Sequence, residues 1–401
     1  MNNQFIRAVE KALIALDDWP HKKIQLFHHN DADGLSSGAI LLRAFERAGF
    51  DVRRVCLEKT YPAVLNRIFE GSEQILVFAD FAGRIAPLLS ELNQKRNLIL
   101  ILDHHVPRPC QDPTVYNLNP ELFGLKGDRD ISASTACYLF ARTMRASNRD
   151  LAPVAVIGAV GDGFFTDNRL AGHNRYPVQD AVRQGLLEVK VRARGERYVL
   201  NTPAGPIPCE ELSDYLDTLG AAGYYQRGPE MGIRVCLQGP SAESDRVFKG
   251  LKDTQTAVFE EEMSRLQAGA LKRTPHLQWF HVKDRFAPMG VKMIGTFCRH
   301  IKDKDYLDSK RYLAGFQWVP DEIPDFGDIG MNQVKISMRV SAYLEGEVRK
   351  GSAIGLNALL PEATNRLGGF SDACHSLAAA TTITIGKEEA LIEEMEKILS
   401  R

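Results

Sequence analysis

The chain has 401 residues, of which 44% are hydrophobic and 25% are charged, and its formal net charge is −1. This length exceeds what a single hydrophobic core of ordinary size holds, so we expect two domains or more. The near-neutral charge excludes the strongly basic surface of proteins that bind long duplexes, although a local basic groove stays open.

Signals for export and membrane insertion are weak. The N-terminal stretch alternates charged and apolar residues at helical spacing, which is not the pattern of a secretion signal. No run approaches the ~20 apolar residues that a membrane span needs. The seven scattered cysteines include no CxxC pair, which favours buried thiols over disulfides or a zinc site. We therefore expect a cytoplasmic protein with no membrane partner.

The first part of the chain alternates short apolar runs with helical patterns. In chain order we predict a helix over 4–18, a strand over 23–28, a helix capped by Ser36 or Ser37 that runs to 49, a strand over 51–58, a helix over 61–71, a strand over 74–80, a helix over 84–95, and a strand over 98–102. This alternation predicts an α/β fold with a doubly wound parallel sheet.

The pattern changes further along. We predict a short strand within 114–120, a helix from Ser132–Ser134 to about 144, and either a helix or a strand in the apolar run near 151–165. Residues 180–275 read as mostly helical, with a long helix over 254–269. From 276 onward strands predominate, with a glycine-rich loop over 367–375 and a C-terminal helix over 388–400. We expect a catalytic domain over 1–240, a helical connector over 241–275 and a smaller mixed α/β domain over 276–401.

Acidic residues and histidines follow the predicted strands. They are His29, Asp31, Asp33, Asp80, Asp103, His104, His105 and Asp162. Each alone is an ordinary turn, cap or loop residue, and Asp31–Gly34 lacks the further ligands of an EF-hand. Ligands of open α/β sheets lie at the carboxyl ends of the strands, so these side chains should meet there. So many carboxylates in one crevice predict two metal ions that share a bridging carboxylate.

The motifs HxDxDG, a lone strand-end Asp, DHH and GD occur here in one order, and in this the chain resembles the DHH phosphoesterase superfamily. That superfamily includes RecJ exonucleases, nanoRNases and phosphoadenosine phosphatases, cyclic-di-AMP phosphodiesterases and family II pyrophosphatases. The resemblance implies two divalent ions, with manganese expected and magnesium or cobalt as alternatives. It covers the chain to about 170 and again from about 276.

The resemblance also assigns roles to the residues. It implies that His29, Asp31 and Asp80 bind one metal. Asp33, Asp80, His104 and Asp162 would bind the other metal, which makes Asp80 the bridge. His105 would stand beside the scissile phosphate, and Asp103 would orient the two histidines. His28 would point to the opposite face of its strand and is read as structural.

The C-terminal part resembles the DHH-associated domain. VKISMRVS is similar to the strand that carries a Ser-x-Arg, which implies that Arg339 binds substrate. LGGFSDACH is similar to a GGH loop, which implies the same for Gly368, Gly369 and His375. The chain departs from that pattern, because five residues separate Gly369 from His375. Residues 219–237 resemble a segment of archaeal RecJ-like proteins, and the role of 180–275 is left open.

These features predict a metal-dependent hydrolase of RecJ-like or nanoRNase-like type that cleaves short single-stranded oligonucleotides or nucleotides. The alternatives within this class are a cyclic-dinucleotide phosphodiesterase and a 3′,5′-bisphosphate nucleotide phosphatase. An alternative of a different class is a catalytically inactive nucleic-acid-binding scaffold, which the full set of ligand residues argues against. A homodimer is compatible with the sequence, which fixes neither the sugar nor the length of the substrate.

Overall fold

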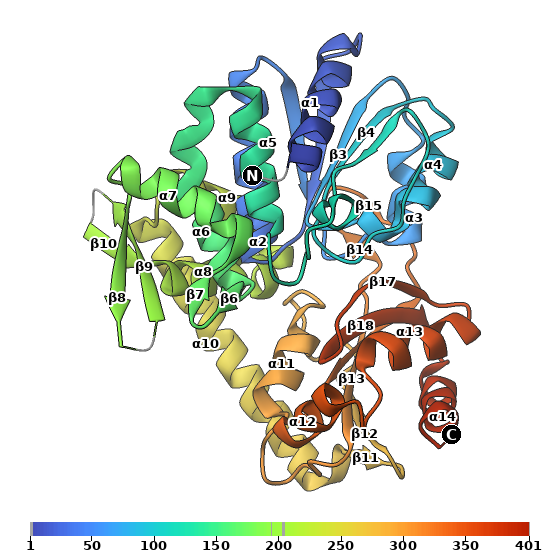
Figure 1. Cartoon of the computed structure of the whole chain (residues 1–401). Coiled ribbons are helices and arrows are strands. Elements are labelled where there is room, and N and C mark those ends of the chain that lie inside the picture. The colour runs from blue at the N-terminus through green and yellow to red at the C-terminus, as the bar shows by residue number, and fades with distance from the viewer. Residues whose placement is uncertain (1–2, 194, 203–204, 401) are drawn as a thin grey trace. The chain divides into compact units, whose positions relative to one another are not determined.

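The structure is a computed structural model that describes residues 3–193, 195–202 and 205–400. The chain forms two compact units, which are coloured from blue to green and from yellow to red over most of their length in Figure 1. The first unit comprises Met1–Gly220 and Arg227–Phe248, and the second comprises Ala221–Gln226 and Lys249–Arg401.

A five-stranded parallel sheet with the order β2-β1-β3-β4-β5 forms the centre of the first unit. Its strands are β1 (Lys23–His28), β2 (Asp51–Cys56), β3 (Ile75–Ala79), β4 (Leu98–Leu102) and β5 (Val115–Asn117). Every residue of β3 and β4 is buried, as expected for a parallel sheet with both faces covered. The predicted α/β class and parallel sheet are confirmed.

Six helices accompany this sheet. They are α1 (Asn3–Asp18), α2 (Ala32–Arg47), α3 (Pro62–Ile68), α4 (Ala86–Asn93), α5 (Ala133–Met144) and α6 (Ala152–Gly161). The apolar run that was ambiguous between helix and strand forms α6. Two glycines let α6 pack closely, because a Cβ at Gly158 would lie 2.5 Å from Asp33 Oδ1 and a Cβ at Gly161 would lie 2.7 Å from Ala32.

Two local predictions in this unit are wrong. Helix α2 begins at Ala32, and its cap is Asp31, whose carboxylate accepts a hydrogen bond from the amide of Gly34 at 2.9 Å. Ser36 and Ser37 are buried inside the helix and cap nothing. The second strand ends at Cys56 and does not reach residue 58.

Most of the remaining elements of the first unit lie within residues 165–220 and 227–238. They are β6 (Phe165–Thr166), β7 (Arg169–Leu170), α7 (Arg175–Arg183), β8 (Leu187–Arg192), β9 (Gly195–Thr202), β10 (Gly205–Pro208), α8 (Cys209–Asp217) and α9 (Gly228–Gln238). The mostly helical reading of 180–275 is therefore wrong for 187–208, where β10-β9-β8 form an antiparallel sheet. The alternation Val-Lys-Val-Arg at 189–192 is a strand pattern.

The second unit has a mixed six-stranded sheet with the order β11-β12-β13-β16-β18-β17. Its strands are β11 (Lys272–Arg273), β12 (Leu277–His281), β13 (Tyr312–Trp318), β16 (Gln333–Arg339), β17 (Phe370–Cys374) and β18 (Ala378–Thr384), and β14 (Glu322–Ile323) pairs with β15 (Gly327–Asp328) outside it. This mixed sheet confirms the expected second, mixed α/β fold. The expected loop over 367–375 is wrong for 370–374, because these residues pair with β18 across a β-bulge.

Three helices of the second unit pack on one face of this sheet around an apolar core: α12 (Ala342–Lys350), α13 (Leu356–Arg366) and α14 (Glu388–Leu399). Helix α11 (Met293–Ile301) contacts β13 and β16 at Gly315 and Ser337, which alternate with the core-facing residues of those strands. Helix α10 (Ala242–Arg265) begins well before the predicted residue 254 and crosses from one unit to the other in sequence. Throughout the described residues, every helix is too short or too polar to traverse a lipid bilayer.

Candidate metal centre

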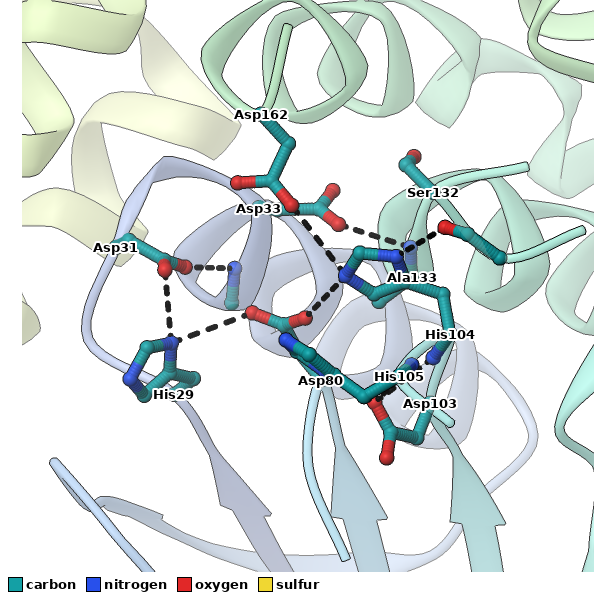
Figure 2. A network of polar contacts seen from close by, with 12 residues as sticks. His29, Asp31, Asp33, Asp80, Asp103, His104, His105, Ser132, Ala133 and Asp162 are labelled. Carbon is teal, nitrogen blue, oxygen red and sulfur yellow. Dashed lines mark hydrogen bonds and ion pairs between the residues drawn. The ribbon is translucent and has the colours of Figure 1, made fainter. Parts of the chain in front are cut away.

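Strand register brings three of the predicted residues to one level of the first sheet. His28, Ala79 and Leu102 are register partners on β1, β3 and β4, so His29, Asp80 and Asp103 are the next residue on each strand. In the order β2-β1-β3, the chain adds β2 on one side of β1 and then adds β3 on the other side, so the strand order switches between β1 and β3. Such a switch point is where open α/β sheets bind ligands. Figure 2 shows the side chains converging there.

Asp31 serves two partners at the start of α2. Its Oδ1 caps the helix, and its Oδ2 lies 2.8 Å from Nδ1 of His29. The same histidine nitrogen lies 3.4 Å from Oδ2 of Asp80. Asp31 therefore fixes the helix start and presents one oxygen to His29 and Asp80.

Asp33 is fully buried in the first turn of α2. Its two oxygens accept hydrogen bonds from the backbone amides of Ala133 and Ser134, at 2.8 and 3.0 Å, so the N-terminus of α5 points at this carboxylate. Burial, with the charge of Asp162 as the next cause, raises the pKa of Asp33 to about 7. A cation would relieve the same penalty.

Asp80 and His104 form the middle of the centre. Oδ1 of Asp80 lies 3.4 Å from Nε2 of His104, and both atoms are buried without a hydrogen-bond partner. His104 Nδ1 lies 2.6 Å from the carbonyl oxygen of Gly127. Since a carbonyl only accepts, Nδ1 carries the proton, and the lone pair of a neutral His104 is on Nε2. Nε2 is therefore the nitrogen oriented for a metal.

The pKa values of Asp80 and His104 are both raised, but for different reasons. Burial, followed by the charge of Asp31, raises the pKa of Asp80 well above its usual range. Burial would lower the pKa of His104, but its contacts with Asp162 and Asp80 outweigh this and raise the pKa well above its usual value. Without a cation, both groups therefore favour their protonated forms, and metal binding should displace protons.

Asp162 is the cap at the end of α6, and its Oδ2 lies 3.3 Å from Nε2 of His104. Its expected position after a strand is wrong, because the preceding apolar run is helical. The residue nevertheless reaches the centre. The close packing of α6 at Gly158 and Gly161, described above, places its end beside Asp33 and Ala32.

Asp103 organises the two histidines through hydrogen bonds. Its Oδ1 accepts from the amide of His104 at 2.8 Å and contacts Nδ1 of His105 at 2.7 Å, while its Oδ2 accepts from the amide of Gly83 at 2.8 Å. Burial would raise the pKa of Asp103, but the positive charge and hydrogen bonds of His105, together with His104, lower it to about 2. Asp103 is therefore ionised and held in place.

The ligand-type atoms fall into groups of three whose atoms all lie within 4.8 Å of one another: His29, Asp31 and Asp80; Asp33, His104 and Asp162; and Asp80, His104 and His105. Ligand atoms that share an ion at about 2.1 Å lie about 3.0–3.4 Å apart. The measured separations, the nitrogen and oxygen donors and the partnerless atoms of Asp80 and His104 all fit divalent cations.

Several supporting residues escaped sequence reasoning. Asn119 is buried and donates to the carbonyl of His105 at 2.7 Å, which fixes the backbone after the DHH motif. Asp217 of α8 accepts from the amide of Ala32 at 2.9 Å. The sequence signal was present only for Asn119, which precedes a proline at a turn, because Asp217 lies 185 residues from its partner.

His28 has the structural role that was expected. Its ring is buried, with Nε2 2.9 Å from Arg54 and Nδ1 2.7 Å from the carbonyl of His29. Burial, followed by the charge of Arg54, lowers the pKa of His28 to about 3. The ring is therefore neutral and packs against Gly38, where a Cβ would lie 2.7 Å from it.

Arg339 lies at the end of β16 in the second unit and donates from Nη1 to the carbonyl of Met338 at 2.7 Å. Its Nε is buried without a partner, and within the described part of the chain no carboxylate forms an ion pair with it. Burial lowers the pKa of Arg339 to about 10. A largely buried cation without an anion is costly, so an external anion is the expected partner.

The glycine loop differs from its expected form. The amides of Gly368 and Gly369 donate to Asn365 and Thr364, and so they close the end of α13. Positive φ at Gly368, 70°, is part of the same helix end. These two amides are therefore already engaged, so the substrate contact that the resemblance implies for Gly368 and Gly369 is not available through their amides. His375 is exposed in the turn between β17 and β18, where its amide donates to Ala378.

The raised pKa of Asp33 predicts how stability depends on pH. In the metal-free protein, the stability from neutral Asp33 is fully present below pH ~3.8 and is lost as pH rises through about 7. Metal binding needs the ionised form, so its stabilising effect should grow over the upper part of that range. The increase in Tm caused by Mn²⁺ over EDTA should therefore be larger at pH 8 than at pH 6.

Differential scanning calorimetry in matched buffers measures both increments. In Asp33→Asn the EDTA-treated protein should lose this part of its pH dependence. Equal Mn²⁺ increments at the two pH values in the unaltered chain would contradict the expectation.

Comparison with known proteins finds a likeness to one family over part of the chain. Residues 23–159 match the model of the DHH family, N-terminal domain. The uncharacterized protein MJ0831 of Methanocaldococcus jannaschii is 33% identical over 166 residues, which are 39% of this chain and 36% of that protein. The match thus spans about a third of the length of this curated relative.

Solved structures extend the likeness in fold to the whole chain. A crystal structure of exonuclease RecJ bound to manganese matches with a TM-score of 0.60 at 17% identity, covering 99% of this chain and 94% of the other. RecJ of Thermus thermophilus in complex with Mn²⁺ matches with a TM-score of 0.62 at 17% identity, covering 100% and 55%. At these identities the likeness concerns the fold.

Proposed function

We propose that the chain is a phosphoesterase that uses two divalent metal ions, because residues 23–159 match the DHH family, N-terminal domain. Manganese is the ion proposed, with magnesium or cobalt as weaker substitutes. The substrates proposed are short single-stranded oligonucleotides or nucleotides. A cytoplasmic location belongs to the same proposal and is supported by seven free cysteines.

One observation carries the proposal: two groups of ligand-type atoms meet at Asp80. His29 and Asp31 lie on one side of this carboxylate, and His104 lies on the other. Its two oxygens face the two sides separately, Oδ2 toward His29 and Oδ1 toward His104. A carboxylate placed in this way is suited to bridge two ions.

The proposed chemistry is in-line hydrolysis of a phosphate ester. Two bound ions would supply a nucleophile at neutral pH and neutralise charge on the phosphate oxygens. His105 is the chain's own candidate to contact the scissile phosphate, because Asp103 holds its Nδ1 and directs Nε2 to another partner. Asp103 and Asn119 are positioning residues, since they act on the histidine and not on the substrate.

The alternatives differ in substrate or in class. A cyclic-dinucleotide phosphodiesterase or a 3′,5′-bisphosphate nucleotide phosphatase would use the same centre. An inactive scaffold would need no intact ligand set, and this chain has ligand-type side chains at all six proposed metal positions. The name of the similar structure, exonuclease RecJ, favours a linear oligonucleotide as the first substrate to test.

The discriminating experiment incubates the Mn²⁺-loaded protein with labelled oligonucleotides of two to ten nucleotides, cyclic dinucleotides and 3′,5′-bisphosphate nucleotides. Hydrolysis of the linear oligonucleotides with the highest kcat/KM supports the proposal. A preference for either other class moves the assignment to that alternative. No hydrolysis of any substrate by metal-loaded, folded protein would favour the scaffold.

Replacing Arg339 is predicted to lower activity without lowering stability. Charge-assisted contacts are worth ~1.5–3 kcal/mol each, so Arg339→Met should lower kcat/KM for an oligonucleotide roughly 10- to 100-fold. Much of this loss should appear in KM. The same change removes a buried cation that has no carboxylate partner among the described residues, so Tm should stay level or rise.

Steady-state kinetics and calorimetry on the same preparation test both signs, and the Mn²⁺ content should stay unchanged. A small aryl phosphodiester, which offers little beyond the reacting group, should lose less activity than the oligonucleotide. A lower Tm, together with an activity loss that is equal for the oligonucleotide and the aryl phosphodiester, would mean that Arg339 only stabilises its strand.

A further inference from the structure

A phenylalanine directly after the metal centre has no role in the account above. Helix α6 ends at Asp162, and two aromatic residues follow it with opposite surroundings. Phe164 is buried, and its ring centroid lies 5.3 Å from that of His104. Phe165 is the next residue, with its Cα about 3.8 Å further along, yet it is 36% exposed. An aromatic face is thus open to solvent one residue beyond the packing of the metal centre.

The hairpin that carries Phe165 has a defined shape. Asp167 and Asn168 connect β6 to β7 with φ of 50° and 55°, which is the conformation of a tight two-residue hairpin turn. The amide of Ala171 donates to the carbonyl of Phe164 at 3.2 Å and closes the base of the hairpin. Phe165 therefore stands on a short, closed element and not on an open loop.

The antiparallel sheet β8–β10 supports this hairpin at two points (Figure 1). At the tip, the amide of Glu196 donates to the carbonyl of Asn168 at 2.9 Å, and Gly195 permits the approach because a Cβ there would lie 2.4 Å from Asn168. On β7, the amide of Leu170 donates to the hydroxyl of Tyr198 at 2.9 Å.

Tyr198 also supports the phenyl ring itself. The two ring centroids lie 6.5 Å apart at an interplanar angle of 36°. Tyr198 is fully buried, and its hydroxyl donates to Glu196 at 2.5 Å, so its position is fixed. Phe165 is thus backed on one side by an immobilised aromatic ring.

We propose that Phe165 is a stacking platform for an unpaired nucleobase of the substrate, with the sheet β8–β10 as its support. The inference rests on the proposed phosphoesterase function, and it assigns a role to the hairpin β6–β7 and the sheet β8–β10, which contribute no residue to the metal centre. An isolated exposed apolar side chain is ordinary. Here the ring stands on a closed hairpin, packs against the buried ring of Tyr198 and lies next in sequence to Phe164, which packs on His104. Base stacking uses such an exposed aromatic ring.

This platform would select for substrates that carry a nucleobase over phosphate compounds that carry none. Every base offers an aromatic face, so stacking would tolerate any sequence, but it would need a base that is not paired. Inorganic pyrophosphate offers no such face. The platform therefore favours substrates with an unpaired base, which include single-stranded oligonucleotides, over phosphates that carry no base.

The test couples a protein change to a substrate change. Dissociation constants are measured by fluorescence anisotropy for a labelled pentanucleotide and for five derivatives, each with one nucleotide replaced by an abasic residue, with Ca²⁺ as the only divalent ion. Phe165→Ala should weaken binding of the intact pentanucleotide roughly 5- to 150-fold. When the abasic residue occupies the stacked position, Phe165→Ala should not weaken binding any further. Phe165→Trp should restore binding.

Tyr343→Ala is the matched control, because Tyr343 is 48% exposed on α12 and belongs to no site described above. Its effect should be within about twofold at every abasic position. If Phe165→Ala weakens binding of all six ligands equally, or of none, the platform is overturned. The second result is also the one expected if Phe165 docks a protein instead of a base. Hydrolysis of the same pentanucleotide with Mn²⁺ is scored separately: cleavage without coupling removes the platform alone, and coupling without cleavage removes the proposed phosphoesterase function alone.

Discussion

Replacing Asp80 with Asn is expected to lower kcat/KM for phosphodiester hydrolysis by at least about a thousandfold. Loss of a single transition-state hydrogen-bond donor typically costs about 10²–10³-fold, and Asp80 is proposed to hold both ions at once. Its two oxygens face His29 and His104 at 3.4 Å on either side, so no other carboxylate described here takes both positions. Asp80→Asn should therefore be the most damaging single change.

Asparagine is chosen because it removes the carboxylate ligand without adding strain to the backbone. Asp80 has a φ of 66°, a left-handed conformation that asparagine adopts more readily than alanine does. Asp80→Ala would add backbone strain to the loss of the ligand. Steady-state kinetics on Asp80→Asn, with Tm measured in EDTA as a check on folding, give the cleaner result.

Asp112→Asn is the matched control for this change. Asp112 lies in the same unit, bonded to Ser90 and Thr114, and belongs to none of the three ligand groups. Its kcat/KM should stay within about threefold of the unaltered chain. If Asp80→Asn falls no further than this control, Asp80 is not a catalytic metal ligand.

Removal of divalent ions is the second large expected effect. Chelation with EDTA should reduce hydrolysis to the background rate, because the residues alone offer no activated nucleophile equivalent to a metal-bound water. Mn²⁺ should restore the activity, and Mg²⁺ or Co²⁺ should restore less. Far-ultraviolet circular dichroism should stay unchanged, since the raised pKa values of Asp33 and Asp80 allow protons to relieve the carboxylate repulsion.

The control for chelation is a Ca²⁺–EDTA complex at the same concentration, which excludes a direct effect of the chelator. Metal analysis of the treated sample should show less than a tenth of an ion per chain. Undiminished hydrolysis at that metal content would overturn the requirement for metal.

Sequence patterns predicted the parts of the fold that depend on local order. The strands of the first sheet end within two residues of their predicted positions, because buried apolar runs and the turns after them are local signals. The same runs brought His29, Asp80 and Asp103 to one edge, which the register confirms. The metal roles of these residues stay predictions.

Long-range packing explains what the patterns missed. Asp162 reaches the centre from the end of a helix, because close contacts of α6 with Ala32 and Asp33 decide its place. The strands at 187–208 lie between helices, and their charged residues hid a two-residue period. The cap of α2 is Asp31 and not Ser36 or Ser37, because helix α2 begins at Ala32, four residues before Ser36, and the Asp31 carboxylate accepts a hydrogen bond from the amide of Gly34.

Metal stoichiometry tests the central claim most directly. The protein is loaded with excess Mn²⁺, passed through a desalting column and analysed by inductively coupled plasma mass spectrometry. We expect two Mn²⁺ per chain in the unaltered protein and in Asp112→Asn, and fewer than two in Asp80→Asn. One ion or none in the unaltered protein, or two retained in Asp80→Asn, would contradict a two-metal centre bridged by Asp80.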